Sequence, residues 1–287
     1  MTPLVDRAIV VTCLGHSGST LLDLILGGHP KIIGLGEVFS ATGWLSRRKS
    51  NPSDARCTCG QNAAECRFWG PVAQSIRSAP NPPPEVRYRP VLETFATVFG
   101  PDSIPVDISK NSKDRLRTIN TIRSISPGTD IRAIHLIKDV RAFVVSRSDR
   151  DRAKHFPIRP MLVLFWQWYL ENRHIRRQFV GAGVPLMTLG YDELCLAPMD
   201  SVRRMTDFLG LEPYPSMSDI SRTASHALRG NRMRLDPKKN RQILYDPRWL
   251  YRNEWVLAAA LSPHIMRYNA REVYGNLGKS RWENPKA

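Results

Sequence analysis

The segment AIVVTCLGHSGSTLLDLILGG, residues 8–28, constrains the fold more than any other part of the chain. Residues 8–15 are apolar and rich in β-branched side chains, which indicates a buried strand that ends at a glycine. Residues 20–28 have the apolar spacing of a helix and finish in two glycines, a common helix stop. A strand, a tight loop and a helix in this order are typical of α/β proteins with a parallel sheet.

The same alternation recurs along the chain. We expect strands over residues 103–109, 131–137 and 184–191, and one long helix over residues 160–179. We assign Trp166 and Trp168 of that helix to the core rather than to a ligand. The sequence therefore predicts the α/β class, with a single P-loop-like domain and a central, mainly parallel sheet flanked by helices. Ligands of such sheets bind at the carboxyl ends of the strands, so the segments 15–19, 109–113 and 138–141 are expected to share one cleft.

We expect one domain over residues 1–287, with an insertion at 38–100 on the substrate side. Within the insertion, SAPNPPPEVRYRP at 78–90 contains closely spaced prolines, which predict a surface connection rather than a helix or a central strand. Nothing in the insertion identifies an acceptor molecule. Its size nevertheless suits substrate selection.

Charge indicates the kind of partner. The chain has 42 Lys and Arg against 26 Asp and Glu, a formal net charge of +16, which favours anionic partners without choosing among them. The longest apolar runs, near residues 8–14 and 21–26, are far shorter than the roughly 20 residues of a membrane span. The first residues fit a core strand better than a signal peptide, so we expect a cytoplasmic protein. Oligomeric state is left open, a homodimer being one alternative.

Five cysteines cannot all pair within one chain. Cys57, Cys59 and Cys66 form a cluster, whereas Cys13 and Cys195 stand alone in apolar surroundings and are expected to be small buried side chains. A closed zinc site uses four Cys or His ligands, and the cluster supplies three with no histidine nearby in the sequence. We therefore predict no metal, and either free thiols or a local disulfide.

The loop GHSGST suits an anion. Its small residues let backbone N–H groups surround an oxyanion at the positive end of a helix, and its hydroxyls add donors. A nucleoside-triphosphate P-loop would require a glycine where Cys13 stands and a lysine where Ser19 stands. The loop therefore fits an anion shorter than a triphosphate better. The predicted cradle consists of Gly15, His16, Ser17, Gly18, Ser19 and Thr20.

Six motifs in order resemble the sulfotransferases that use 3′-phosphoadenosine 5′-phosphosulfate (PAPS), in particular the tyrosylprotein and carbohydrate types. The segment HSGSTLLDLILGGHPKIIGLGE at 16–37 resembles the phosphosulfate loop and the residues after it. VDISKNSKDRL at 106–116 is similar to the D-S-S-K segment, and HLIKDVRAFVVSR at 135–147 to the 3′-phosphate motif. YDEL at 191–194, DFLGL at 207–211 and HALRGN at 226–231 resemble later signatures.

The resemblance implies a sulfotransferase that moves a sulfuryl group from PAPS to a hydroxyl of a small molecule, glycan or lipid, giving 3′,5′-ADP without a metal. Lys110 is similar to the catalytic lysine, with Lys113 as the alternative. Glu37 is similar to the carboxylate that takes the acceptor's proton. His16 occupies the place of a basic residue and is expected to act as a cation near the leaving group. For Glu37 the competing interpretation is a structural carboxylate that caps the next segment.

The resemblance also implies which residues bind the nucleotide end of PAPS, including its 3′-phosphate. Lys138 and Ser146 match the residues that hold the 3′-phosphate, with Arg141 as a helper. The family's arginine is replaced by Lys138, which keeps the charge but loses a bidentate fork. The remaining residues expected to bind the donor are Tyr191, Gly230, Asn231 and Arg234.

Two other functions fit parts of the sequence. A nucleotide-dependent kinase with a degenerate P-loop would require magnesium, and the missing lysine argues against it. A basic nucleic-acid-binding protein would explain the net charge, but Arg and Lys are spread along the chain rather than gathered in one module. We therefore expect no nucleic-acid partner.

Overall fold

The computed structural model describes residues 2–78, 82–110, 114–153, 155, 159–223, 225–236, 242–279 and 281–282. The chain divides into two compact units. Unit 1 comprises residues 1–12, 20–133 and 214–242, and unit 2 comprises residues 13–19, 134–213 and 243–287.

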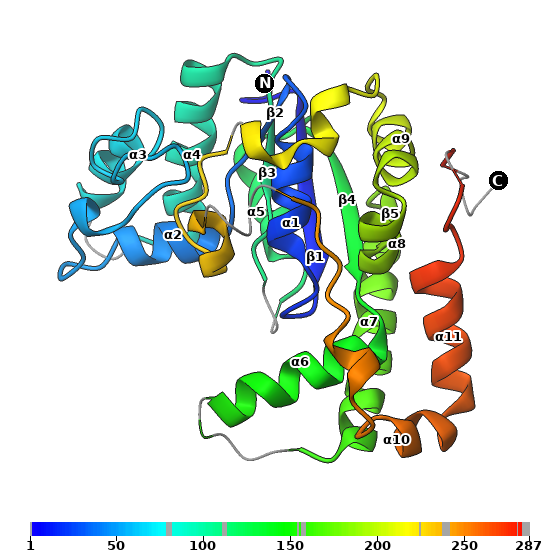
Figure 1. Ribbon diagram of the computed structural model, residues 1–287. Coiled ribbons are helices and arrows are strands. Elements are labelled where there is room, and N and C mark those ends of the chain that lie inside the picture. The colour runs from blue at the N-terminus through cyan, green and yellow to red at the C-terminus, as the bar shows by residue number, and fades with distance from the viewer. Residues whose placement is uncertain are drawn as a thin grey trace. The chain divides into compact units, whose positions relative to one another are not determined.

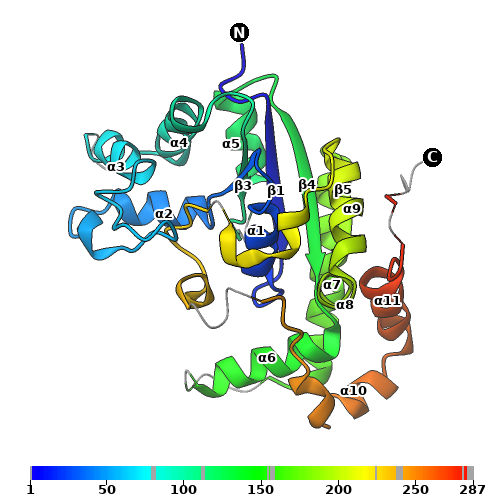
Figure 2. The same ribbon diagram turned by 45° about the horizontal axis from the view of Figure 1, so that its top comes forward.

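The strands form one five-stranded parallel sheet in the order β2-β3-β1-β4-β5. Unit 1 contains β2, β3, nearly all of β1 and the first half of β4, and the rest of β4 and β5 lie in unit 2. Figure 2 shows β3 directly beside β1. The four predicted strands are confirmed, and the three-residue strand β2 was not predicted. The strands are β1 (Arg7–Cys13), β2 (Ile32–Gly34), β3 (Ile104–Asp107), β4 (Asp130–Ile137) and β5 (Leu186–Gly190).

The apolar run of the first strand explains its place within the sheet. From Ala8 to Cys13 every residue of β1 is buried, and Ile9 pairs with Val106 of the parallel strand β3. β2 pairs with the other side of β3 over Ile32–Gly34. A strand with neighbours on both sides and both faces buried reads as a continuous apolar run, as observed here.

Unit 1 carries the helices of the predicted insertion. α2, α3 and α4 pack against one another, and α5 packs against α4 (Figure 1). The prediction that residues 78–90 exclude a helix was wrong, because α4 begins at Pro84 and continues through Pro90. Proline is tolerated at the first helical position, where its missing N–H would have no partner. The helices of unit 1 are α1 (Ser19–Leu26), α2 (Val38–Leu45), η1 (Pro52–Asp54), α3 (Trp69–Arg77), α4 (Pro84–Phe99), α5 (Arg117–Ile125), η2 (Pro215–Ser218), η3 (Ile220–Arg222) and η4 (Arg232–Leu235).

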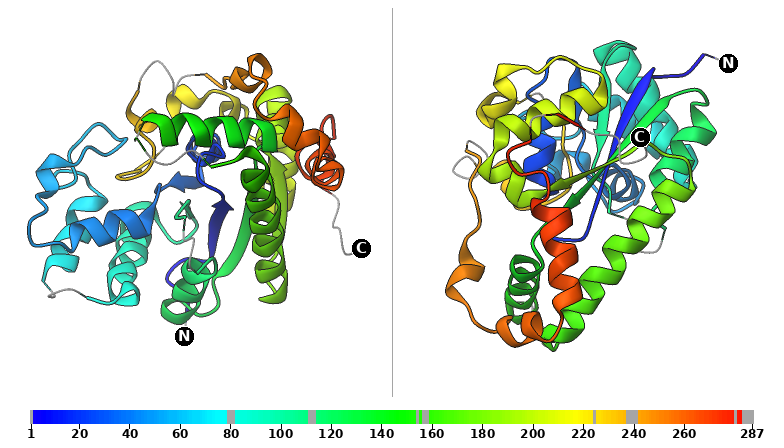
Figure 3. Two further views of the ribbon diagram at one scale, coloured as in Figure 1. Left: turned by 90° about the horizontal axis from the view of Figure 1, so that it is seen from below. Right: turned by 90° about the vertical axis from the view of Figure 1, so that its right-hand side faces the viewer.

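Unit 2 is dominated by the long predicted helix. α7 packs against β5, α6, α10 and α11, and its course beside α11 can be followed in Figure 3. Trp168 is fully buried whereas Trp166 is 42% exposed, so the expected core role is confirmed for Trp168 only. In the part of the chain that the structure describes, we find no helix that combines the length and the apolar character of a membrane span. The helices of unit 2 are α6 (Val140–Ala153), α7 (Met161–Gly181), α8 (Tyr191–Leu196), α9 (Pro198–Leu209), η5 (Arg248–Tyr251), α10 (Val256–Ala260) and α11 (Pro263–Tyr274).

Candidate functional site

The loop after β1 has an unusual backbone. His16 and Gly18 both have positive φ angles, 70° and 91°, and Ser17 between them is buried. Alternation of this kind turns successive N–H groups toward one side, which makes a concave binding surface for an anion. A non-glycine residue in the left-handed region costs about 1 kcal/mol or more, and such strain is concentrated in ligand-binding loops and active sites. The chain enters α1 at Ser19 and Thr20, both buried.

Within unit 2, the loop packs on an aromatic ring. A Cβ on Gly18 would overlap the Tyr191 ring, so this position requires glycine for space as well as for its φ angle. Lys138 Nζ lies 4.9 Å from the centroid of the same ring and makes a cation–π contact with it. Gly18, Tyr191 and Lys138, far apart in the sequence, are therefore neighbours. They make up what we call the donor cluster.

Lys138 is the cation of this cluster, and it is deeply buried. Its side chain is 5% exposed, and Nζ donates to Asp246 Oδ2 at 3.1 Å. Arg248 also donates to the Asp246 carboxylate, from Nε at 2.7 Å and from Nη2 at 2.9 Å. Hydrogen bonds from Arg248, together with the charge of Lys138, lower the pKa of Asp246 below its usual range. An anion that binds Lys138 must therefore compete with an ionised carboxylate.

Arg141 and Ser146 differ in what surrounds them. Arg141 donates three hydrogen bonds to the fully buried Asp139 and stacks on the Trp249 ring, 4.0 Å from its centroid. Burial would raise the pKa of Asp139, but the Arg141 bonds lower it overall. Arg141 thus already has a structural partner. Ser146 is half-buried on α6.

Next to Lys138 in the chain, Asp139 shares a hydrogen-bond donor with a second acidic side chain, Asp192. Asp139 accepts from Asn269 Nδ2 at 2.8 Å and from the Tyr274 hydroxyl at 2.9 Å, and Asp192 accepts from the same hydroxyl at 3.2 Å. Burial, followed by the charge of Asp139, raises the pKa of Asp192. This network ties the end of β4 to α8 and α11. This network could not be predicted from sequence patterns, because its bonds join residues 53 to 135 positions apart.

Within unit 1, the predicted base and the predicted catalytic lysine are direct neighbours. Lys110 Nζ donates to Glu37 Oε1 at 3.1 Å, and the two side chains are 24% and 22% exposed. Both residues follow the carboxyl ends of adjacent parallel strands, Glu37 after β2 and Lys110 after β3. The Glu37 side chain makes no capping hydrogen bond to α2. Glu37 is the N-cap residue of α2 without a capping bond from its side chain, and its role as the base stays a prediction.

Asp107 and Ser109 hold this pair in place. Asp107, the last residue of β3, accepts from the Val38 N–H at 3.4 Å and from the Tyr88 hydroxyl at 2.8 Å. Ser109 Oγ accepts from the Phe39 N–H at 3.0 Å. These bonds attach the start of α2, just after Glu37, to the chain that carries Lys110. The only sequence signal for them was the place of Asp107 and Ser109 at a strand end.

The later basic segment lies beside Glu37 in the same unit. A Cβ on Gly230 would lie 3.9 Å from Glu37 Cγ, and the Glu37 N–H donates to the Arg229 carbonyl at 3.3 Å. Asn231 caps η4 by accepting from the Met233 N–H. Arg234 donates from Nη2 to the Leu228 carbonyl at 2.8 Å, so it fixes the backbone of this turn. The alternative lysine, Lys113, lies outside the described residues.

Chemically, the two units offer two sets of groups. Unit 2 contains a loop with amides arranged for an oxyanion and a buried ammonium beside an aromatic ring, which suits a nucleotide with more than one anionic group. Unit 1 contains a carboxylate beside an ammonium, which suits proton transfer together with charge neutralisation. An α/β sheet with such a loop after its first strand defines a protein of the P-loop-like class.

A family model described as the Sulfotransferase family matches residues 8–216, so the chain belongs to this family. The sulfotransferase domain from the curacin biosynthetic pathway aligns with a TM-score of 0.56 at 16% identity, covering 98% of this chain and 99% of that chain. The sulfotransferase domain of the Synechococcus PCC 7002 olefin synthase aligns with a TM-score of 0.48 at 18% identity, over 90% of this chain and 95% of that chain. No curated protein sequence matches this one. The first structural likeness shows that the fold is shared, and the expected resemblance to sulfotransferases is confirmed.

Proposed function

We propose that the protein transfers a sulfuryl group from PAPS to a hydroxyl of a small molecule, glycan or lipid and releases 3′,5′-ADP. Membership of the Sulfotransferase family supports sulfuryl transfer as the reaction. The single observation that supports the donor is the donor cluster, because Gly18, Tyr191 and Lys138 combine a loop of amides, a flat ring and a buried cation. No triphosphate lysine is present, since Ser19 stands at that position.

The residues present fit this donor. The amides of residues 15–20 would bind the phosphosulfate, and the hydroxyls of Ser17, Ser19 and Thr20 would add donors. Lys138 would bind the 3′-phosphate, with Tyr191 against the nucleotide and Arg141 and Ser146 as further contacts. The resemblance to the family adds Gly230, Asn231 and Arg234 to the residues proposed to bind the donor.

When bound, the donor supplies a sulfuryl group whose S–O bond to phosphate breaks as a new S–O bond to the acceptor oxygen forms. Glu37 would accept the proton that the acceptor hydroxyl loses. Lys110 and His16 would neutralise the negative charge that develops on the departing phosphate oxygen. Because Lys110 already touches Glu37, one ammonium can stabilise the carboxylate before transfer and the leaving group during it.

Calorimetry with PAPS and with 3′,5′-ADP tests the proposal. We expect tight binding without added magnesium, loss of binding in Lys138→Met, and transfer of label from isotopically labelled PAPS to a hydroxyl acceptor in a screen. Binding of only a nucleoside triphosphate with magnesium would overturn the proposal in favour of a kinase. Sub-micromolar binding to DNA or RNA at physiological salt, with no PAPS binding, would favour the nucleic-acid alternative.

A further inference from the structure

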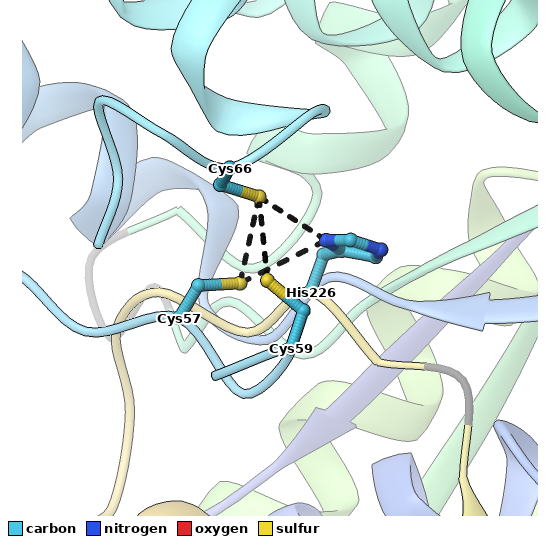
Figure 4. Close-up of side chains that lie close together, drawn as sticks. All are labelled: Cys57, Cys59, Cys66 and His226. Atoms are coloured by element: carbon cyan, nitrogen blue, oxygen red, sulfur yellow. Dashed lines mark hydrogen bonds between the residues drawn. The ribbon is translucent and has the colours of Figure 1, made fainter. Parts of the chain in front are cut away.

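The fold brings a fourth potential metal ligand to the cysteine cluster. Cys57, Cys59 and Cys66 lie in the stretch between η1 and α3, and His226 lies in the segment after η3, all within unit 1. The ligand atoms of these four residues all lie within 4.8 Å of one another (Figure 4). His226 is 160 positions from Cys66, which is why the sequence showed three ligands and no nearby histidine.

The distances match a tetrahedral site. Zinc bonds of about 2.3 Å to sulfur and about 2.0 Å to nitrogen give tetrahedral edges of about 3.8 Å between sulfurs and about 3.6 Å between sulfur and nitrogen. Cys66 Sγ lies 3.7 Å from Cys59 Sγ and 3.8 Å from Cys57 Sγ. His226 Nδ1 lies 3.2 Å from Cys66 Sγ and 3.8 Å from Cys57 Sγ. Four of the six edges thus lie within about 0.4 Å of the expected lengths.

The local chain supports such a site. Gly60, with a φ of 94°, closes a turn by donating its N–H to the Cys57 carbonyl at 3.1 Å, which turns Cys57 and Cys59 toward the same point. The Trp69 N–H donates to Cys66 Sγ at 3.4 Å, a contact that stabilises a thiolate. The Trp69 indole also donates to the His226 carbonyl. Cys57, Cys66 and His226 are 1%, 1% and 7% exposed, so the three ligands are shielded from water.

A disulfide accounts for these positions less well. Cys66 Sγ lies 3.7–3.8 Å from the other two sulfur atoms, whereas a disulfide requires about 2.05 Å. A single disulfide would also use only two of the three thiols. It would not explain why the third thiol and the His226 imidazole lie at the same place. We propose that Cys57, Cys59, Cys66 and His226 bind one structural zinc ion. Three soft thiolates and one imidazole in a closed tetrahedron select zinc among the common divalent metals.

Zinc would attach the cysteine stretch to the chain beside Glu37. The Thr58 N–H donates to the Ala227 carbonyl at 3.2 Å, and the His226 N–H donates to the Gly34 carbonyl of β2 at 2.7 Å. Three residues further on, the Arg229 carbonyl accepts from the Glu37 N–H. The site is thus a crosslink between the cysteine stretch and the 225–229 segment, which backbone hydrogen bonds attach to the end of β2. This departs from the sequence-based expectation of no metal, and it does not depend on the proposed reaction.

Metal analysis of the whole protein tests the site without reference to activity. Protein purified without a metal-affinity tag or chelator is expected to contain about one zinc per chain by mass spectrometry. X-ray absorption at the zinc edge is expected to show three sulfur ligands and one nitrogen. Wild-type protein that contains another metal, or that neither retains zinc nor takes up one equivalent after reduction, would overturn the proposal.

Variants and a thiol count complete the test. Cys66→Ser and His226→Ala are expected to bind zinc at least ten-fold more weakly, whereas Cys195→Ser, which changes a cysteine of α8, keeps one zinc. If the variants do not fold, a measurement on the wild type still tests the proposal. Denaturation of the wild type in chelator without reductant is expected to release one zinc and to expose five free thiols. Three free thiols would show a disulfide and contradict zinc ligation. Chelation is also expected to lower the unfolding temperature of the wild type.

Discussion

The Glu37 carboxylate accepts a hydrogen bond from Lys110 Nζ, and both side chains are roughly three-quarters buried. In such a place the surroundings strengthen the interaction of the two charges relative to bulk water. Three hydrogen bonds, accepted by Asp107, Ser109 and the Arg229 carbonyl, fix the chain at Glu37 and at the two residues after it. The carboxylate therefore sits on a rigid support, as a proton acceptor requires.

The variant Glu37→Gln tests the role of this carboxylate. The amide keeps the shape of the side chain but cannot accept the acceptor's proton, so we expect kcat to fall by about 10²–10⁴-fold. PAPS affinity by calorimetry should stay within about two-fold of the wild type, because the donor cluster is unchanged. The matched control is Glu85→Gln, an exposed glutamate of α4. Equal loss of kcat in the control, or loss of folding in Glu37→Gln, would leave Glu37 only a structural role.

At the scale of elements, the end of β4 and the segment before η5 are joined through one ion pair. Lys138 follows β4, and Asp246 precedes η5 by two residues. Their separation of 108 positions explains why the sequence identified the lysine but not its carboxylate partner. The arrangement makes Asp246 a competitor of any phosphate that binds Lys138.

Removing this competitor is expected to tighten donor binding. Asp246→Asn deletes one negative charge beside Lys138, and an interaction of about 1 kcal/mol corresponds to an affinity for 3′,5′-ADP that rises about five-fold. Calorimetry of the variant measures the change. Asp200→Asn, which breaks an ion pair with Arg203 on α9, is the control and should bind as the wild type does. Weaker binding in Asp246→Asn would show instead that Asp246 positions the lysine for its ligand.

At the scale of the whole molecule, buried carboxyl groups make stability depend on pH. Burial raises the pKa of Asp23, on α1, to about 7, despite hydrogen bonds from the Gly36 amide and the Ser225 hydroxyl. Burial raises the pKa of Asp107 to about 6. The folded chain holds protons on these groups that the unfolded chain releases above about pH 4. The free energy of unfolding should therefore fall as pH rises from about 4 to about 7.

The variant Asp23→Asn is expected to remove a large part of this fall. At about 1.4 kcal/mol per pKa unit, the stability of the variant relative to the wild type should improve by up to about 4 kcal/mol between pH 4 and pH 8. Denaturant unfolding at several pH values measures the difference. Asp102→Asn, at an exposed position, provides the reference. Parallel stability curves for the wild type and Asp23→Asn would show that Asp23 ionises normally.

Local sequence patterns predicted the strand, the loop and the helix that follow one another over residues 8–28, because a strand or a helix depends on the spacing of nearby apolar residues. The strand and helix alternation, and hence the α/β class, followed in the same way. The helix over Pro84–Phe99 was missed because buried side chains such as Tyr88 and Phe95 outweigh the poor local propensity of its prolines. β2 was missed because three residues carry too short a pattern.

Only the tertiary structure decided which polar groups meet. It paired Glu37 with Lys110 across 73 positions, Lys138 with Asp246 across 108, and Cys57 with His226 across 169. The neighbours of a side chain along the chain do not determine such partners, since the order of the strands and the path of the loops bring them together. The sequence could therefore name the loop and the charged residues of the site, whereas the fold supplied the carboxylate beside Lys138 and the fourth ligand of the cysteine cluster.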